Sequence, residues 1–153
     1  MSEAMKGELV GGCLCGAVRY VLRAGFRLNP YACHCTDCQS RTGSAFSEHM
    51  LFAEADIAVT GELDCGEFRQ PSGANSRIYG CAKCKARIYA VNDSRAGMAS
   101  LRCGTLDRSA ELVPVAHVWV NSKQPWIGLP EGTRMMAEQP CTSEAWIALV
   151  GMQ

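Results

Sequence analysis

Residues 12–16 read Gly-Cys-Leu-Cys-Gly, and residues 81–84 read Cys-Ala-Lys-Cys. Cysteines this close together rarely reach disulfide geometry, but each pair can offer two thiolates to one metal ion. Tetrahedral zinc binds four thiolates at about 2.3 Å, so the two pairs together would fill its coordination sphere and exclude a substrate. We therefore expect a structural zinc that ties the N-terminal strand to the middle of the chain, with ligands Cys13, Cys15, Cys81 and Cys84.

The alternative for these four residues is that they are buried free thiols, which pack well in cores. Two tight pairs rarely arise that way by accident, so a metal site is favoured. Gly12 and Gly16 flank the first pair and are expected to relieve the backbone where it curls around the ion. Lys85 stands where zinc-binding turns often have glycine, a departure that removes no ligand.

A second cluster lies in residues 33–38, which read Cys-His-Cys-Thr-Asp-Cys. Its thiols, from Cys33, Cys35 and Cys38, can hold a second zinc and leave one position open, as catalytic sites do. In an extended stretch His34 points to the opposite face, where it would serve as a base or support the ligands from behind.

The fourth ligand of this cluster stays open at the level of sequence. Four side chains could close the site and make it inert: Cys65, Cys103, His49 and His117. The two cysteines among them fall at expected strand positions and are more simply explained as buried thiols. Cys141, in the irregular C-terminal region, is expected to be exposed.

Composition narrows the class of protein. The chain has 153 residues, which suits one domain, and its 48% apolar and 20% charged residues are ordinary for a globular protein. Fifteen Lys and Arg balance fifteen Asp and Glu, so neither nucleic acid nor an anionic membrane is an expected partner. No apolar run approaches a membrane span, and residues 1–8 are too polar for a signal peptide, so we expect a cytoplasmic protein, with a homodimer as the default oligomer.

Short runs broken by glycine and turn residues, without a helical stripe over three turns, predict a mainly β fold of antiparallel sheets. Residues 36–42 are expected to form one helical turn, and the chain after Trp126 to be irregular. The expected strands are 17–22, 44–51, 57–59, 67–70, 77–79, 87–91, 98–103 and 116–120.

The order of these motifs, with Thr42-Gly-Ser44, Gly104-Thr-Leu-Asp107, His117-Val-Trp119 and Lys123-Gln-Pro-Trp126, resembles the glutathione-dependent formaldehyde-activating (GFA) family. The resemblance runs from about Gly11 to Pro130. It implies an Mss4-like (β-tent) fold, a structural zinc on the four-cysteine set and a second zinc on the three-cysteine set. It also divides the chain into an N-terminal extension with a possible first strand (1–10), a zinc-binding domain (11–130) and a tail packed on that domain (131–153).

The same resemblance implies a carbon-sulfur lyase that joins formaldehyde to glutathione, giving S-hydroxymethylglutathione, with the second zinc responding to glutathione. The residues alone agree, because an open thiolate-bound zinc can bind and orient another thiolate for attack on a small aldehyde. Two alternatives remain: a non-catalytic zinc-stabilised binding module, and a thiol redox sensor whose trio oxidises.

Contacts to the substrate are expected from arginines, since a guanidinium can bind a glutathione carboxylate bidentately. Arg41 is nearest to the second cluster in sequence and Arg77 is a candidate in space, although either could be a surface charge. His117 would face the site or, as the favoured alternative, be a hydrogen-bonded strand histidine. Ser40 stands where many relatives carry a basic residue, and Trp126 is expected in the core or at an edge.

Overall fold

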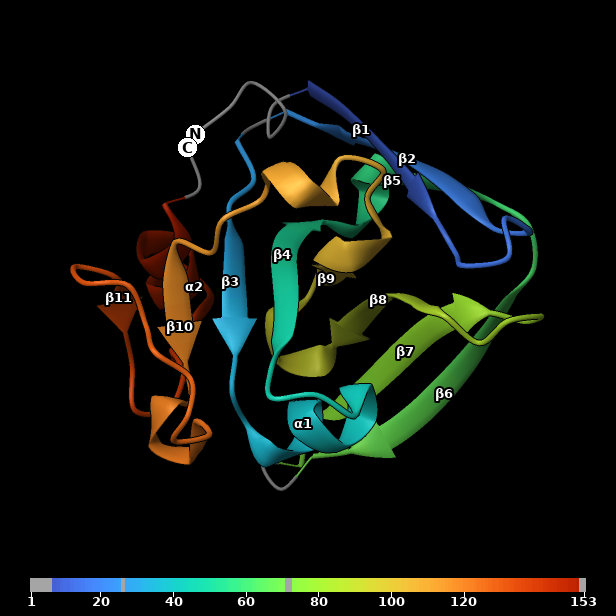
Figure 1. Ribbon diagram of the computed structural model, residues 1–153. Helices are drawn as coiled ribbons and strands as arrows, with labels where there is room; N and C mark the ends of the chain where they lie inside the picture. The colour runs from blue at the N-terminus through green and yellow to red at the C-terminus, as the bar shows by residue number, and fades with distance from the viewer. Residues whose placement is uncertain (1–6, 26, 71–72, 152–153) are drawn as a thin grey trace.

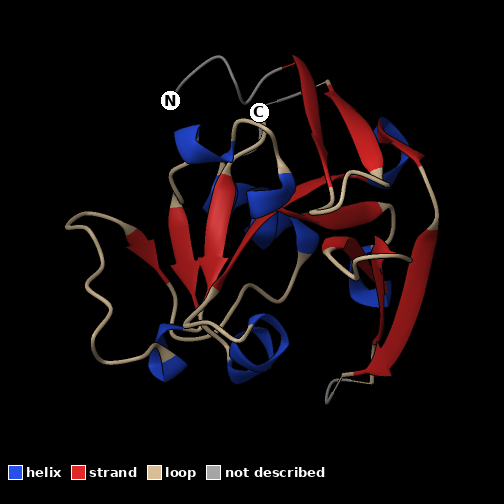
Figure 2. Cartoon of the chain, turned by 45° about the vertical axis from the view of Figure 1, so that its right-hand side comes forward, coloured by secondary structure: helices blue, strands red, loops and turns tan. Residues whose placement is uncertain are grey.

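The structure is a computed structural model that describes residues 7–25, 27–70 and 73–151. Strands dominate it, and the helices are short (Figures 1 and 2). The smaller sheet has three antiparallel strands in the order β1-β2-β5. Their bounds are β1 Gly7–Gly12, β2 Arg19–Ala24 and β5 Ile57–Thr60.

The larger sheet has eight strands in the order β11-β10-β3-β4-β9-β8-β7-β6. β10 runs parallel to both β3 and β11, and the other neighbours are antiparallel. The fold is therefore mainly β with mostly antiparallel sheets, as the sequence predicted. The strands are β3 Pro30–Cys33, β4 Ser47–Ala53, β6 Leu63–Arg69, β7 Asn75–Cys81, β8 Arg87–Asn92, β9 Met98–Arg102, β10 Ala116–Val118 and β11 Arg134–Met135.

Both faces of β4 are buried, and the strand contributes side chains to two separate hydrophobic cores. Met50 and Phe52 belong to the core beneath the smaller sheet, where Tyr20 and Leu22 also pack. Leu51, on the opposite face, lies in a second core with Trp146 of the C-terminal helix α2. Alternate residues of a strand point to opposite faces, which explains how one strand serves two cores.

Among the described residues two α-helices complete the fold, with short 3-10 turns between the strands. The helix α1 (Thr36–Thr42) lies beyond the end of β3, and Gly43 in the left-handed conformation ends it (Figure 1). α2 spans Ser143–Val150 between a Thr142 N-cap and Gly151. No helix within the described ranges has the length and apolar character needed to cross a bilayer.

Each of the eight expected strand regions overlaps an observed strand, and β1 falls mostly in the stretch where a first strand was considered possible. The expectation of an irregular C-terminal region was wrong, because that region contains β11 and α2. α2 has only eight residues, about two turns, so it is too short to show an apolar stripe over three helical turns, the pattern by which a helix was recognised in the sequence. The sequence also failed to predict β3, whose four residues are all buried and therefore do not alternate.

Candidate metal centres

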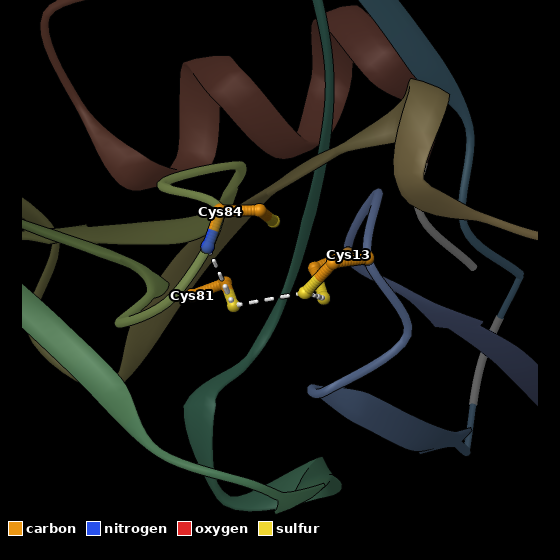
Figure 3. Close-up of side chains that lie close together, drawn as sticks. Cys13, Cys81 and Cys84 are labelled. Carbon is orange, nitrogen blue, oxygen red and sulfur yellow. Dashed lines mark hydrogen bonds between the residues drawn. The ribbon is translucent and has the colours of Figure 1, made fainter.

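The first candidate centre joins two hairpins that are far apart in the sequence. One pair of cysteines follows β1, and the other spans the end of β7 and the turn before β8. The sulfur of Cys15 lies 3.6 Å from that of Cys13 and 3.8 Å from that of Cys81. Figure 3 shows Cys13, Cys81 and Cys84 pointing toward one another. All four sulfur atoms lie within 4.8 Å of one another, so this group could hold a metal ion.

The backbone around this four-cysteine cluster is shaped to present sulfur. The N–H of Val18 donates to Cys13 Sγ at 3.2 Å, and the N–H of Cys84 donates to Cys81 Sγ at 3.4 Å. Hydrogen bonds from N–H groups favour the charged thiolate, the form that binds metal. The N–H of Ala86 is the main reason that the pKa of the Cys84 thiol falls to about 6.

Glycine is required twice in the first hairpin. Gly16 has a φ of 80°, and a Cβ on Gly12 would lie 2.4 Å from the carbonyl oxygen of Val18. In the second hairpin Lys85 adopts a φ of 64°, so a side chain occupies a left-handed position that favours glycine. This is the conformation that glycine would adopt without strain in such a turn.

The second candidate centre is built by one short segment. Cys33 ends β3, Cys35 is the N-cap of α1, and Cys38 lies in the first turns of that helix. Their sulfur atoms also lie within 4.8 Å of one another and could hold a metal ion. The N–H of Cys38 donates to Cys35 Sγ at 3.3 Å, so the start of the helix fixes the geometry of the cluster. Cys33 and Cys38 are buried, whereas Cys35 is half-buried.

The three thiols perturb one another strongly. Hydrogen bonds with Cys33 and then Cys38 lower the pKa of the Cys35 thiol, whereas hydrogen bonds with Cys35 and then Cys38 raise the pKa of the Cys33 thiol. One thiol of the cluster therefore loses its proton readily while the other two retain theirs. Three thiolates this close together would repel one another strongly unless a cation were bound between them. A bound cation would remove this conflict, which supports the assignment of the group as a metal site.

None of the four candidate fourth ligands joins this cluster within the described residues. His49 comes nearest, with Nε2 at 3.7 Å from Cys38 Sγ, but it does not lie within 4.8 Å of every sulfur. Cys103 is fully buried, as expected, whereas Cys65 is exposed on β6, which corrects the expectation of a buried thiol. Cys65 lies in a strand whose residues are exposed or half-buried, so its strand position did not imply burial.

His34 and His117 form a buried pair behind the cluster. His34 Nε2 lies 2.9 Å from His117 Nδ1, and burial lowers the pKa of both imidazoles, that of His34 to about 4. Neutral imidazoles can pair in this way, one as donor and the other as acceptor. The carbonyl of His34 also accepts hydrogen bonds from Gln39 and Ser122. His117 is thus a hydrogen-bonded strand histidine, and a contact from it to substrate stays a prediction.

A hollow of about 660 Å³ lies beside the three-cysteine cluster. Four cationic side chains and one carboxylate stand among its lining residues, and we call it the arginine hollow: Arg41, Lys85, Arg87, Arg102 and Glu48. Burial lowers the pKa of Arg87 and Arg102, and the charge of Arg41 lowers both further. The Cys38 thiol acts in the opposite direction on both, which places the hollow within electrostatic reach of the cluster.

The sequence predicted only part of this hollow. Arg41 lines it, with its guanidinium 3.8 Å from the centre of the Phe68 ring. Arg77 does not belong to its lining and faces Asp93 at 3.7 Å, so a substrate contact from Arg77 stays a prediction. Arg87 and Arg102, which come from β8 and β9 and also line the hollow, were not singled out from the sequence. No local sequence pattern marks these two arginines, because adjacent strand residues point to opposite faces and a buried neighbour does not imply a buried arginine.

Trp126 was expected in the core or at an edge, and it is 73% exposed. Its indole N–H donates to the side chain of Gln124 at 2.7 Å. It lines a shallower surface depression together with Ser40. Cys141 is exposed, as expected.

Comparisons with known proteins agree with this arrangement. The sequence profile of the glutathione-dependent formaldehyde-activating enzyme family matches residues 8–122, which include both cysteine clusters. A comparison with curated protein sequences finds no match. A crystal structure of a Rhodobacter sphaeroides protein, a structural genomics target, is similar with a TM-score of 0.53 and 21% sequence identity. The match covers 69% of this chain and 98% of that protein, and at this identity it shows the fold.

Proposed function

The chain belongs to the glutathione-dependent formaldehyde-activating enzyme family, and on that premise we propose that it joins a small thiol to an aldehyde through a three-cysteine zinc centre. Glutathione and formaldehyde are the pair that the family name indicates. The activity would be that of a carbon-sulfur lyase, since the addition is reversible.

The residues fit zinc in both clusters. Thiolates around a tetrahedral zinc at about 2.3 Å stand about 3.8 Å apart. Two sulfur pairs of the four-cysteine cluster stand 3.6 and 3.8 Å apart, and all its sulfurs lie within 4.8 Å of one another. Cys13, Cys15, Cys81 and Cys84 would hold a structural zinc, and Cys33, Cys35 and Cys38 a second zinc. When bound, the second zinc would supply an open position for an incoming thiol and favour its ionised form.

The reaction conserves its atoms without a redox partner. The thiol sulfur forms a bond to the carbonyl carbon, the C=O double bond becomes a single bond, and the proton lost by the thiol is balanced by one gained on the former aldehyde oxygen. The protein itself contributes by holding the cysteine side chains in fixed positions. The α1 N-terminus holds Cys35 and Cys38, and half-buried Cys35 leaves the cluster accessible from that side. Proximity alone can greatly raise the rate of such an addition.

The observation that carries this proposal is the group of three thiols without a fourth ligand among the described residues. It is tested by following exchange between ¹³C-formaldehyde and its glutathione adduct by NMR, with protein loaded with two zinc ions per chain. The expected result is exchange faster than in protein-free buffer, and loss of the acceleration in Cys35→Ser. An exchange rate equal to that of the buffer at millimolar thiol would overturn the proposal.

Redox sensing is the second candidate, and one observation favours it. Cys35 is half-buried, and its thiol has a lowered pKa beside two further thiols, which is the setting in which thiols oxidise readily. Free thiols and bound zinc are counted before and after mild peroxide. Release of one zinc with loss of two or three thiols, in protein that does not accelerate exchange, would favour the sensor over the enzyme.

A further inference from the structure

We propose that the arginine hollow is a carboxylate-binding site that receives the acid groups of the thiol. The inference deepens the proposed function and rests on it for the thiol, whereas the anion site can be tested alone. Arg87 and Arg102 are its central groups, and Arg41 and Lys85 complete it.

The first argument is position, because both cysteine segments build the hollow. Arg41 follows Cys38 by three residues on α1, so the two side chains share one face of that helix. Arg102 donates a hydrogen bond to Ser47, and Ser47 is the strand partner of Cys33. The hollow thus shares α1 and β4 with the surroundings of the three-cysteine cluster, although none of the three cysteines is itself a lining residue.

The opposite wall of the hollow comes from the other cysteine turn. Lys85 directly follows Cys84, and Arg87 begins β8 two residues later. The four-cysteine cluster thereby fixes where these two cations stand. This arrangement gives the structural site a role in shaping the binding site as well as in holding the hairpins.

The second argument is charge. The lining has four cations, and Glu48 is the one carboxylate among its described residues. The guanidinium groups of Arg41, Arg87 and Arg102 repel one another, and the last two are partly withdrawn from water. Gathering like charges away from water is unfavourable unless a counter-charge is present. A bound anion supplies that counter-charge.

The third argument is that the central pair has no carboxylate partner among the described residues. Lys85 is paired with Asp64, and Arg41 faces Asp37 at 3.9 Å. Within the described part of the chain no ion pair joins a carboxylate to Arg87 or Arg102. Nη1 of Arg87 is buried and has no hydrogen-bond partner among these residues. Buried N–H groups are nearly always satisfied, and a carboxylate oxygen of a ligand would satisfy this one.

The shape of the ligand follows from these groups. Guanidinium groups bind carboxylates through two parallel hydrogen bonds, and two arginines side by side suit a ligand with two acid groups. A hollow of about 660 Å³ falls within the usual range for small-molecule sites. The hollow therefore suits a small ligand with two carboxylates, as in the glutathione that the family name indicates.

The test compares probes that differ in acid groups. Binding to the zinc-loaded full chain is measured by calorimetry with mercaptosuccinate, 3-mercaptopropionate and 2-mercaptoethanol, which carry two, one and no carboxylates, with glutathione alongside. Succinate carries two carboxylates and no thiol, so it reports on the anion site alone. Affinity should rise by about 10-fold or more per carboxylate, the effect of a hydrogen bond between charged groups.

Variants assign the effect to the hollow. Arg87→Gln and Arg102→Gln should each weaken mercaptosuccinate and succinate by about 10-fold or more and leave 2-mercaptoethanol unchanged. Glu48→Gln, which removes the lone negative charge, should strengthen succinate binding. Arg23→Gln is the matched control, because that arginine is exposed on β2 and paired with Glu8. Zinc content and thermal midpoint show whether each variant folds. If Arg87→Gln and Arg102→Gln do not fold, Arg41→Gln and Lys85→Gln are measured in their place, and they should also weaken the binding of mercaptosuccinate and succinate.

The outcomes separate this inference from the proposed function. Equal affinity for the three mercapto probes, or succinate binding that survives in the variants of the hollow, overturns the anion site and leaves thiol chemistry at the cluster intact. Succinate binding that is lost in Arg87→Gln supports the anion site even if no thiol reacts with aldehyde, in which case only the proposed function fails.

Discussion

The two cysteine clusters offer the same kind of ligand, a thiol, but they collect these thiols over very different distances along the sequence. The four-cysteine cluster draws on two hairpins, with Cys15 and Cys81 separated by 66 positions, and its four candidate ligands lie in or beside tight turns. The three-cysteine cluster takes every ligand from residues 33–38 at the start of one short helix. The first cluster can therefore fix how the smaller sheet sits on the larger one, whereas the second constrains only its own segment.

This difference indicates which cluster contributes more to the stability of the fold. A cross-link between distant segments removes much more freedom from the unfolded chain than a local one. A local cluster contributes less to stability, so an incomplete coordination sphere there has little effect on the fold. Function is thus expected where the metal is least needed for folding.

The largest effect is expected from a ligand of the cluster that joins the hairpins. Cys81→Ser should release its metal and unfold the chain or lower its thermal midpoint severely, because structural zinc contributes about 10–16 kcal/mol to folding in small zinc domains against a total stability of about 5–15 kcal/mol. Circular dichroism on heating and zinc per chain measure both effects. Cys103→Ser is the matched control, since Cys103 is as buried as Cys81 but belongs to neither cluster. Equal midpoints for the two variants would refute a structural role for the first cluster.

A smaller effect on stability, with complete loss of activity, is expected at the local cluster. Cys35→Ser should reduce zinc from two ions per chain to one and leave the fold intact. Serine is a preferred N-cap, so α1 keeps its start even though the sulfur is lost. Cys141→Ser, at an exposed thiol outside both clusters, should retain two zinc ions. If Cys35→Ser unfolds as readily as Cys81→Ser, the contrast between the clusters is wrong.

Much of this contrast could be predicted from the sequence, because the ligands of each cluster are read from spacing alone. Cys-x-Cys and Cys-x-x-Cys fix which sulfurs are close, and the short alternating runs fix a mainly β fold. What spacing does not encode is strand order. β10 lies between β3 and β11 and runs parallel to both, and its pairing with β3 joins residues more than 80 positions apart, which depends on packing of the whole sheet.

The arginine hollow shows a second limit of sequence reasoning. Arg41 was identified because it is close to Cys38 in the chain, whereas Arg87 and Arg102 come from β8 and β9 and meet it only through the fold. A charged residue in a strand is usually a solvated one, and nothing local in the sequence indicates that these two gather at a shared site. Sites assembled from several strands are the part that local patterns predict least well.

Removal of His49 sharpens the comparison by asking whether the second cluster is truly incomplete. His49 is the side chain that comes nearest, at 3.7 Å from Cys38. His49→Gln should keep two zinc ions per chain, with zinc affinity at the second site changed by less than about 10-fold, below the 10- to 100-fold loss seen even for groups that only support a ligand. Competition with a chromophoric chelator measures that affinity. A fall to one zinc per chain would make His49 a fourth ligand, and the second cluster would then be as closed as the first.

The smallest effect is expected at Lys85, beside the closed cluster. Its φ of 64° costs a side chain about 1–2 kcal/mol, whereas glycine there loses about 0.5–1 kcal/mol through the greater freedom of the unfolded chain. Lys85→Gly should therefore stabilise the fold by about 1 kcal/mol or less, after allowance for the exposed ion pair with Asp64. Introducing the change into an Asp64→Asn background separates the two contributions, and urea unfolding measures each. A loss of stability in that background would show that the turn around Cys84 carries no backbone strain, and that the lysine is held there by contacts beyond the ion pair.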